Sequence, residues 1–321
     1  MRALILGGTG FVGRALVGEL RSSGHRVLVV HRGRTEPDGL GTAEHLHSSR
    51  EHLERVLEDI RRFAPEVFVD VTAGTKPEAA QALRIVDELE LRPIALSSGD
   101  VYRAYDSLRA DAITDPMPLA ESAPVRVVRY PDRDEGDTAD YEKLDVEDAY
   151  LARSGTVLRL PMVYGAHDDQ RREDFVLRRI RAGRNVVPTG DGSLLWTRGS
   201  VDQIASAIRR SIEVDARGEV INVGEATTAP IALWVRWIAE AAGSRIDLVR
   251  VPDDVLPADL TITRGRAQHL QFDVTKAATV LGWQHADPKA CVAASVRWHM
   301  EHPPPGTPAD LSGDDAALSR A

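Results

Sequence analysis

The sequence contains very little cysteine and very little lysine. It has a single cysteine, Cys291, which excludes an internal disulfide and a metal site built from several cysteines. Lysine is also scarce, and arginine supplies most of the positive charge. Any lysine that falls in a candidate site can therefore be followed individually. The lysines are Lys76, Lys143, Lys276 and Lys289.

Long apolar runs and an excess of positive charge are absent too. No segment approaches the ~20 consecutive apolar residues that a membrane span requires. The formal net charge is −9, whereas nucleic-acid-binding proteins are normally basic, so a general nucleic-acid partner is not expected. Because the first apolar segment already begins at Ala3, we expect no signal peptide and a cytoplasmic protein. A hydrophobic content of 43% is enough to form a buried core.

The chain does contain a glycine-rich turn close to its start. An apolar segment runs into residues 7–13, which read GGTGFVG, and an amphipathic run follows. Gly7 permits a tight turn, Gly10 lets a phosphate approach the backbone, and Gly13 lets a helix lie close to the sheet. The N–H groups at the start of that helix would face the anion. This pattern predicts dinucleotide binding, although similar turns also join strands to helices where no ligand binds.

Strand and helix patterns alternate along the chain, which favours a parallel sheet covered by helices. We predict an α/β protein with a doubly wound Rossmann sheet and a smaller C-terminal substrate domain. Residues 1–165 and 200–226 are assigned to the Rossmann domain, and residues 166–199 and 227–300 to the substrate domain. Residues 301–321 contain three consecutive prolines followed by small and acidic residues, so a disordered tail is expected.

Local periodicity predicts the positions of the elements. Residues 103–140 carry four prolines among many charges, and we expect a long irregular loop there, of the kind that forms a lid. Strands are predicted at 3–6, 27–30, 67–71, 93–96, 156–160 and 220–223. Helices are predicted at 11–22, 50–63, 77–89, 141–153, 201–212 and 231–242.

Several short segments occur in the order typical of one known family. Besides the glycine turn, residues 97–102 read SSGDVY and residues 158–165 read LRLPMVYG. Later matches are Val-Asp at 201–202, Asn-Val-Gly at 222–224 and Leu-Gly-Trp at 281–283. Together they resemble the extended short-chain dehydrogenase/reductase family, the group of nucleotide-sugar epimerases and dehydratases.

The resemblance covers residues 1–300 and implies the activity. It implies an NAD(P)-dependent oxidoreductase, epimerase or dehydratase that acts on a hydroxyl-bearing small molecule such as a nucleotide sugar. A homodimer is an expectation from the family only.

The residues after the second strand distinguish between the two nicotinamide cofactors. An acid there would bind the ribose 2′-hydroxyl and repel a 2′-phosphate. The sequence has His31, Arg32 and Arg34 instead, and guanidinium groups suit a phosphate. We therefore predict NADP(H) over NAD(H), the alternative being that both arginines are solvated loop charges. The resemblance implies further cofactor contacts at Thr9, Phe11, Val12, Ala73 and Val163.

The family's hydride chemistry uses a tyrosine, a lysine four residues later and a serine or threonine hydroxyl. By the resemblance, Ser98 supplies the hydroxyl and Tyr141 the phenol, but the lysine position holds Asp145. A free tyrosine with a pKa near ~10 is a poor base at neutral pH, and a neighbouring carboxylate would raise that pKa further. The missing lysine is the main departure from the family pattern.

Three interpretations stay open. In the first, Lys143 or an arginine replaces the missing cation. In the second, Asp100, which stands where related dehydratases carry a carboxylate base, acts as the general base. In the third, the protein binds a dinucleotide without turning it over, as a regulatory or RNA-associated protein; atypical family members such as the chloroplast stem-loop-binding proteins also lack the tyrosine–lysine pair.

Two further groups of side chains have competing interpretations. His45 and His47 show the alternating spacing of a strand, but no third and fourth ligand accompanies them, so we predict no metal site. An arginine cluster follows Gly165 and either binds a substrate diphosphate or forms a solvated helix face. Trp196 is expected to cover the substrate pocket. The cluster consists of Arg178, Arg179, Arg181 and Arg184.

Overall fold

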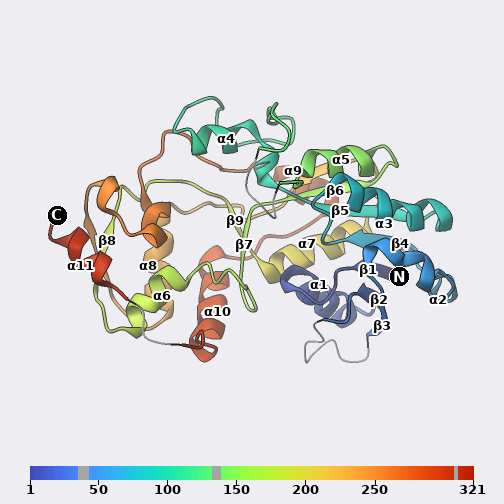
Figure 1. Cartoon of the computed structure of the whole chain (residues 1–321), viewed down its shortest axis with the longest axis horizontal. Coiled ribbons are helices and arrows are strands. Elements are labelled where there is room, and N and C mark those ends of the chain that lie inside the picture. The colour runs from blue at the N-terminus through green and yellow to red at the C-terminus, as the bar shows by residue number, and fades with distance from the viewer. Residues whose placement is uncertain (35–42, 132–138, 307–309) are drawn as a thin grey trace.

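The computed structural model describes residues 1–34, 43–131, 139–306 and 310–321. A seven-stranded parallel sheet forms the centre of its first lobe (Figure 1). Its strand order is β3-β2-β1-β4-β5-β6-β10, and every neighbouring pair is parallel. The order reverses between β1 and β4, as in a doubly wound Rossmann sheet, which confirms the predicted fold. The strands are β1 (Arg2–Leu6), β2 (Arg26–His31), β3 (Glu44–His47), β4 (Val67–Asp70), β5 (Arg92–Ser98), β6 (Thr156–Leu160) and β10 (Val220–Asn222).

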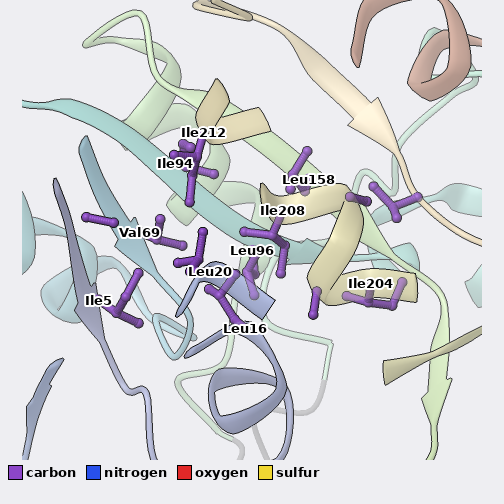
Figure 2. Close-up of a cluster of buried hydrophobic side chains, with 14 of the residues drawn as sticks. Ile5, Leu16, Leu20, Val69, Ile94, Leu96, Leu158, Ile204, Ile208 and Ile212 are labelled. Carbon is purple, nitrogen blue, oxygen red and sulfur yellow. The ribbon is translucent and has the colours of Figure 1, made fainter. Parts of the chain in front are cut away.

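Helices cover both faces of this sheet, which explains why its central strands are apolar without alternation. One face is covered by α1 (Phe11–Ser22), α7 (Val201–Glu213) and α9 (Thr275–Leu281), and the other by α2 (Leu57–Phe63), α3 (Lys76–Leu89) and α5 (Lys143–Leu151). Figure 2 shows the first face, where side chains of α1 and α7 meet those of the strands in one apolar cluster. The labelled members are Ile5, Leu16, Leu20, Val69, Ile94, Leu96, Leu158, Ile204, Ile208 and Ile212.

A second lobe is built where the chain leaves the sheet after β6 (Figure 1). It has two short parallel strand pairs and an apolar core around Tyr102, Tyr164, Trp234 and Phe272, all buried. Its elements are β7 (Met162–Tyr164), α6 (Asp174–Arg181), β8 (Val186–Thr189), β9 (Arg198–Ser200), α8 (Ile231–Ala241), β11 (Asp247–Arg250), η4 (Asp253–Val255), η5 (Ala258–Thr263), α10 (Pro288–Glu301) and α11 (Ser312–Leu318).

The structure differs from the predicted elements at several places. Helix α4 (Arg103–Arg109) occupies part of the predicted irregular loop, because Ala104, Ser107 and Leu108 form a buried face at helical spacing. The predicted helix 50–63 is a 3-10 helix, η1 (Arg50–Val56), followed by α2. Strand β3 was not predicted, since three of its four residues are exposed and it is not apolar.

The chain end also differs from its prediction. A disordered tail was expected for residues 301–321, but residues 312–318 form α11, whose Asp314 and Ala317 are buried. The ordering has a physical cause in the buried ion pair between Arg179 of α6 and Asp314, with N···O at 2.7 Å. None of the helices among the described residues has the length and apolar content that a bilayer crossing requires.

Candidate cofactor and active site

A cavity of about 930 Å³ opens at the carboxyl ends of β1, β2 and β4. Its wall contains the glycine turn 7–13, the end of β2 and the start of η1. Ligands of doubly wound sheets bind at this place, outside the carboxyl ends of the strands where the strand order reverses. The predicted cofactor residues that line the cavity are Gly7, Thr9, Gly10, Phe11, Val12, Gly13, His31, Arg32 and Arg34.

Gly7 and Gly13 have the structural roles that their spacing predicts, and Gly10 lies beside open space. Gly7 has a φ of +92°, a conformation that favours glycine, and its amide donates to Val30 O at 3.1 Å. A Cβ on Gly13 would lie 2.1 Å from the Gly7 carbonyl oxygen, so only glycine allows α1 to approach this closely. A Cβ on Gly10 would meet no described atom within 4 Å and would project into open space.

These features fit the pyrophosphate of a dinucleotide. Gly10 precedes the first turn of α1, and no side chain of the described residues caps that helix. Its first N–H groups therefore remain available to an anion beside the open space at Gly10. The residues present can hold an NAD(P) molecule here.

The cavity also contains residues that sequence reasoning missed. Arg50 forms a two-point ion pair with Asp70, at 2.6 and 2.7 Å, and donates to Thr72 Oγ1 at 2.7 Å. Burial would raise the pKa of Asp70, but the Arg50 guanidinium outweighs it and holds that pKa below its ordinary value. The sequence signal that could have identified this pair was Asp70, an acid at the end of a predicted buried strand. Other unpredicted lining residues are Ser48, Ser49, Glu51, Glu78 and Gln81.

Two predicted cofactor residues lie apart from the wall of this cavity. Ala73 is buried after β4, where its amide donates to Asp70 Oδ1 at 3.0 Å and its carbonyl accepts from Lys143 Nζ. Val163 is buried in β7 and packs in the apolar cluster of the first sheet face. Their contact with a cofactor remains a prediction.

The predicted catalytic side chains Ser98, Asp100 and Tyr141 come together at the carboxyl end of β5. Ser98 is the last residue of this strand, and Asp100 follows it in the 3-10 helix η2 (Gly99–Val101). The Tyr141 phenol donates to Asp100 Oδ2 at 2.9 Å, and the Asp100 amide donates to Ser98 Oγ at 3.4 Å. Ser98 and Asp100 line a second cavity of about 310 Å³ together with the rings of Tyr105, Trp196 and Phe272.

The pKa values of this group favour protonated forms. Burial raises the pKa of Asp100, although the hydrogen bond from Tyr141 and the charges of Arg126 and Lys143 partly oppose the shift. Burial raises the pKa of Tyr141 far above its ordinary value, and the adjacent Asp100 carboxylate adds to the shift. The phenol therefore stays protonated at neutral pH in the protein without ligands, so that little phenolate is present to act as a base.

Asp145 lies outside this group, although it occupies the family's lysine position. Helix α5 begins at Lys143, so Tyr141 precedes the helix and the four-residue spacing does not place Asp145 beside the phenol. Asp145 instead accepts from Arg129 at 2.9 Å and from the Tyr130 hydroxyl at 2.6 Å. The sequence has a negative residue at the family's lysine position, but this carboxylate does not lie beside the Tyr141 phenol.

Lys143 lies inside the protein, close to the phenol. Its Nζ donates to the carbonyl oxygens of Ala73 and Leu96, the latter at 2.9 Å, and lies 5.9 Å from the centre of the Tyr141 ring. Burial lowers the pKa of this ammonium group. That Lys143 replaces the displaced cation stays a prediction.

The arginines of the cluster, which lie on α6 and just after it, form ion pairs with acids of the second lobe. Arg179 is buried and binds Asp259 and Asp314, each at 2.7 Å. The other three arginines pair with Asp259, Asp174 and Asp315, and none of the four lines the 310 Å³ cavity. Arg172, which precedes the cluster, does line it and pairs with Asp168 at 2.9 Å.

A third imidazole accompanies His45 and His47, contrary to the expectation from sequence. His31 lies opposite His47 in the β2–β3 register, with ring centres 4.8 Å apart. Its Nδ1 accepts a hydrogen bond from the Gly33 amide at 3.2 Å, which leaves the proton of the neutral ring on Nε2. One ring nitrogen of each of the three histidines lies within 4.8 Å of the others, a spacing that could hold a metal ion, so the absence of a metal site here stays a prediction from the sequence.

Comparison with known proteins gives the chain relatives over nearly its whole length. Residues 3–85 match the NAD dependent epimerase/dehydratase family. A 3-diazoavenalumate denitrifying reductase from a Streptomyces species is 30% identical and covers 90% of this chain and 97% of the relative. The UDP-glucose 4-epimerase of Mycolicibacterium smegmatis is 26% identical over 94% of this chain and 98% of its own length.

Solved structures agree on the fold. A dTDP-glucose 4,6-dehydratase from Bacillus anthracis, solved in complex with NAD, superposes with a TM-score of 0.72. It is 16% identical, and the match covers 94% of this chain and 97% of the dehydratase. Together with the cavity at the glycine turn and the relatives in sequence, these findings establish that the chain belongs to the NAD-dependent epimerase/dehydratase family, within the extended short-chain dehydrogenases/reductases.

Proposed function

We propose that the protein is an NADP(H)-dependent oxidoreductase that acts on a hydroxyl- or carbonyl-bearing small molecule. The observation that carries the proposal is the coexistence of two sites: an uncapped glycine turn beside a 930 Å³ cavity, and a Ser98–Asp100–Tyr141 group beside a second cavity. The first suits a dinucleotide, and the second offers hydroxyl and carboxyl groups to a substrate oxygen. The catalytic interpretation is favoured over a purely regulatory one because the relatives in sequence include a reductase and an epimerase.

The chain's own residues take distinct roles in this proposal. Ser98 and Tyr141 hold the substrate oxygen, and Tyr141 moves its proton. Lys143 supplies the cation near the phenol, and Ala73 and Val163 contact the nicotinamide half of the cofactor. When bound, the cofactor supplies or accepts a hydride.

The preference for NADP(H) rests on charge at the end of β2. Arg32 and Arg34 line the cavity, both are exposed, and β2 ends in His31 rather than in an acid. We expect NADPH to bind more tightly than NADH by about tenfold, because two guanidinium groups can each bind the 2′-phosphate. Titration calorimetry with both cofactors on wild type and on Arg34→Ser tests this. Equal affinities in wild type would contradict the preference.

The proposed substrate class is a nucleotide sugar, following the UDP-glucose epimerase relative. The reductase relative is named for a different molecule, so a substrate panel needs carbonyl compounds as well. Turnover is followed by the nicotinamide absorbance, with Tyr141→Phe as the test variant. We expect this variant to lose at least 100-fold in kcat while its NADPH affinity is unchanged, because a general acid or base contributes about that factor.

The outcomes separate the two interpretations. Turnover that survives Tyr141→Phe unchanged would remove the phenol from the mechanism. Tight NADPH binding without turnover of any compound would instead favour the dinucleotide-binding regulatory protein. A homodimer is a further proposal from the family, and light scattering on the purified protein tests it.

A further inference from the structure

We propose that the 310 Å³ cavity beside Ser98 and Asp100 binds an aromatic ring, and that the protein interconverts small aromatic carbonyl compounds and their alcohols. The inference rests on the proposed function, because the same cofactor supplies or accepts the hydride. It adds a substrate class besides the nucleotide sugar. The proposed ligand is an uncharged single ring with a carbonyl group attached directly to it.

Aromatic side chains from three separate segments line this cavity. Tyr105 lies on α4, Trp196 between β8 and β9, and Phe272 between η5 and α9. The rings of Tyr105 and Trp196 meet at 72°, with their centres 6.3 Å apart. An aromatic ligand gains edge-to-face or offset-stacked contacts with such rings in addition to the burial of its apolar area. The other apolar lining residues are Leu160, Pro161, Met162 and Leu270.

Contacts behind the wall hold the Phe272 ring in place before any ligand binds. The Phe272 amide donates to Thr197 Oγ1 at 2.8 Å, and its ring contacts that of Tyr102, with centres 5.6 Å apart. A Cβ on Gly99 would lie 2.3 Å from Phe272 Cζ, so the glycine lets this ring approach the strand end that carries Ser98. Because the ring is already fixed, it loses little side-chain entropy when a ligand binds.

The polar part of the cavity lies at the proposed reaction groups. Ser98 and Asp100 line it, and the Tyr141 phenol donates to Asp100 Oδ2 at 2.9 Å. A carbonyl oxygen two bonds from a ring can therefore reach these groups while the ring contacts the apolar wall. The guanidinium of Arg172 also lines the cavity, but it pairs with Asp168 at 2.9 Å. Its charge is balanced without a ligand, so an uncharged compound suits the site.

The size of the cavity matches one substituted ring. Its 310 Å³ is one third of the 930 Å³ of the cavity at the glycine turn, and lies at the lower end of the range of about 300–1,000 Å³ for small-ligand pockets. A nucleotide sugar is several times larger than a single substituted ring and would extend beyond this cavity. Among the described residues, no arginine of α6 lines it to bind a diphosphate. A compact aromatic compound is enclosed as a whole and buries most of its apolar surface.

The reaction balances with one hydride and one proton. In the direction of reduction, the carbonyl carbon gains a hydride from the reduced nicotinamide that the proposed function requires, and the π-electron pair of the C=O bond moves to the oxygen. The oxygen takes one proton, which comes from water through the polar groups that line the cavity. One carbonyl compound, one reduced cofactor and one proton thus give one alcohol and one oxidised cofactor. The reverse reaction uses the same steps in the opposite order.

The first test measures binding without a reaction. Benzamide has the aromatic ring and the carbonyl oxygen but is not reduced, and cyclohexanecarboxamide is its saturated counterpart. In titration calorimetry with wild type, we expect the Kd of benzamide to be at least about fivefold lower than that of cyclohexanecarboxamide. Trp196→Leu should reduce this ratio at least about twofold, because it removes one ring but keeps an apolar side chain. The matched control is Trp237→Leu, which replaces a ring of α8 that does not line the cavity and should preserve the ratio.

Equal Kd values for the two amides in wild type would overturn the proposal, as would an unchanged ratio in Trp196→Leu. Tyr105→Leu gives the same readout if Trp196→Leu fails to fold. The titrations are repeated with NADPH bound, where benzamide should still bind. If benzamide and NADPH exclude each other, the cavity holds the nicotinamide ring rather than a substrate, and the proposal is wrong.

The second test compares benzaldehyde with cyclohexanecarbaldehyde in the presence of NADPH, followed by the nicotinamide absorbance. We expect the KM of benzaldehyde to be at least about fivefold lower, and Trp196→Leu to reduce that difference while kcat changes little, because the ring contacts act on binding. NADPH affinity is measured separately on the same protein. Absence of NADPH binding would defeat the proposed function, whereas NADPH binding and turnover of a nucleotide sugar, with benzaldehyde left unreduced, would defeat this inference alone.

Discussion

At the scale of single residues, two glycines of the same turn differ in whether the fold needs them. Gly13 is required by the fold, because a Cβ there would lie 2.1 Å from the Gly7 carbonyl oxygen. Gly10 has no described atom within 4 Å of such a Cβ, so the fold does not need a glycine there. Because Gly10 lines the cavity, we expect the ligand rather than the fold to require a glycine there.

This difference predicts opposite behaviour for two alanine variants. Gly13→Ala should lower the free energy of unfolding by about 2 kcal/mol or more, because the backbone of the turn must move. Gly10→Ala should leave that free energy within about 0.5 kcal/mol of wild type while it weakens NADPH binding at least tenfold. Urea unfolding and titration calorimetry measure the two effects. Normal NADPH affinity in Gly10→Ala would show that no phosphate approaches this residue.

Asp145 provides a second prediction at this scale. Restoring the family's residue with Asp145→Lys should not increase activity, because position 145 faces Arg129 and Tyr130 rather than Tyr141. The Arg129 side chain is 40% exposed, so losing its ion pair should change the free energy of unfolding by less than about 1 kcal/mol. Steady-state kinetics and urea unfolding provide both numbers. A clear gain in kcat would mean that residue 145 reaches the phenol during turnover.

At the scale of elements, helices α6 and α10 are joined by a buried group with an unusual protonation state. Glu173 precedes α6, accepts from Ser295 of α10, and lies 3.5 Å from His299 Nε2. Burial raises the pKa of Glu173 to about 7. Burial also lowers the pKa of His299, so this region holds both side chains in their neutral forms over part of the pH range.

The raised pKa of Glu173 predicts a pH-dependent stability. The folded state binds this proton more tightly than the unfolded state, whose pKa is 4.5, so stability is lost as pH rises from about 4.5 to about 7. The loss should reach about 3 kcal/mol and stay constant above that window. Glu173→Gln cannot titrate there and should lack this loss.

Urea unfolding of wild type and Glu173→Gln at about pH 5 and about pH 8 checks the prediction, since the difference between the two proteins cancels the opposing contribution of His299. The variant should gain relative to wild type at the higher pH. An equal difference at both pH values would mean that Glu173 ionises normally in the folded protein.

Helix α11 depends on one buried charge. Asp314→Ala should lower the free energy of unfolding by about 3 kcal/mol, because Asp259 would then be the one acid among the described residues that still pairs with the fully buried Arg179. Asp315→Ala on the same helix is the control. Its pair with Arg184 is exposed on both sides, so its loss should cost less than about 1 kcal/mol. Similar losses from both variants, measured in urea, would contradict the role of burial.

At the scale of the whole molecule, cofactor binding should be coupled to stability. A ligand that binds only the folded state at 100 times its Kd stabilises it by about 2.7 kcal/mol. We expect NADPH at this concentration to raise the melting temperature of wild type and to raise that of Gly10→Ala by about half as much or less, because tenfold weaker binding leaves a stabilisation of about 1.4 kcal/mol. Differential scanning fluorimetry measures both shifts. An equal shift in the two proteins would place the cofactor away from the glycine turn.

The sheet and the cofactor cavity could be predicted because their signals are local in the sequence. The strands β1, β2, β4, β5 and β6 are apolar runs, and the glycine turn specifies its own backbone. Elements without such signals were missed or misjudged. The polar strand β3 is held by pairing with β2, and α11 by an arginine more than a hundred residues earlier in the chain. Neither stabilising contact can be read from the segment itself.

The sequence by itself determined the doubly wound fold and the glycine turn beside the large cavity, because apolar periodicity and glycine spacing act over a few residues. It also named Ser98, Asp100, Tyr141 and Lys143, but their relations were decided only by the tertiary structure. Starting α5 at Lys143 turns Asp145 outward and leaves Tyr141 bound to Asp100. A helix start that differs by two residues from its prediction changes which charge faces the phenol, and that start depends on packing between distant segments.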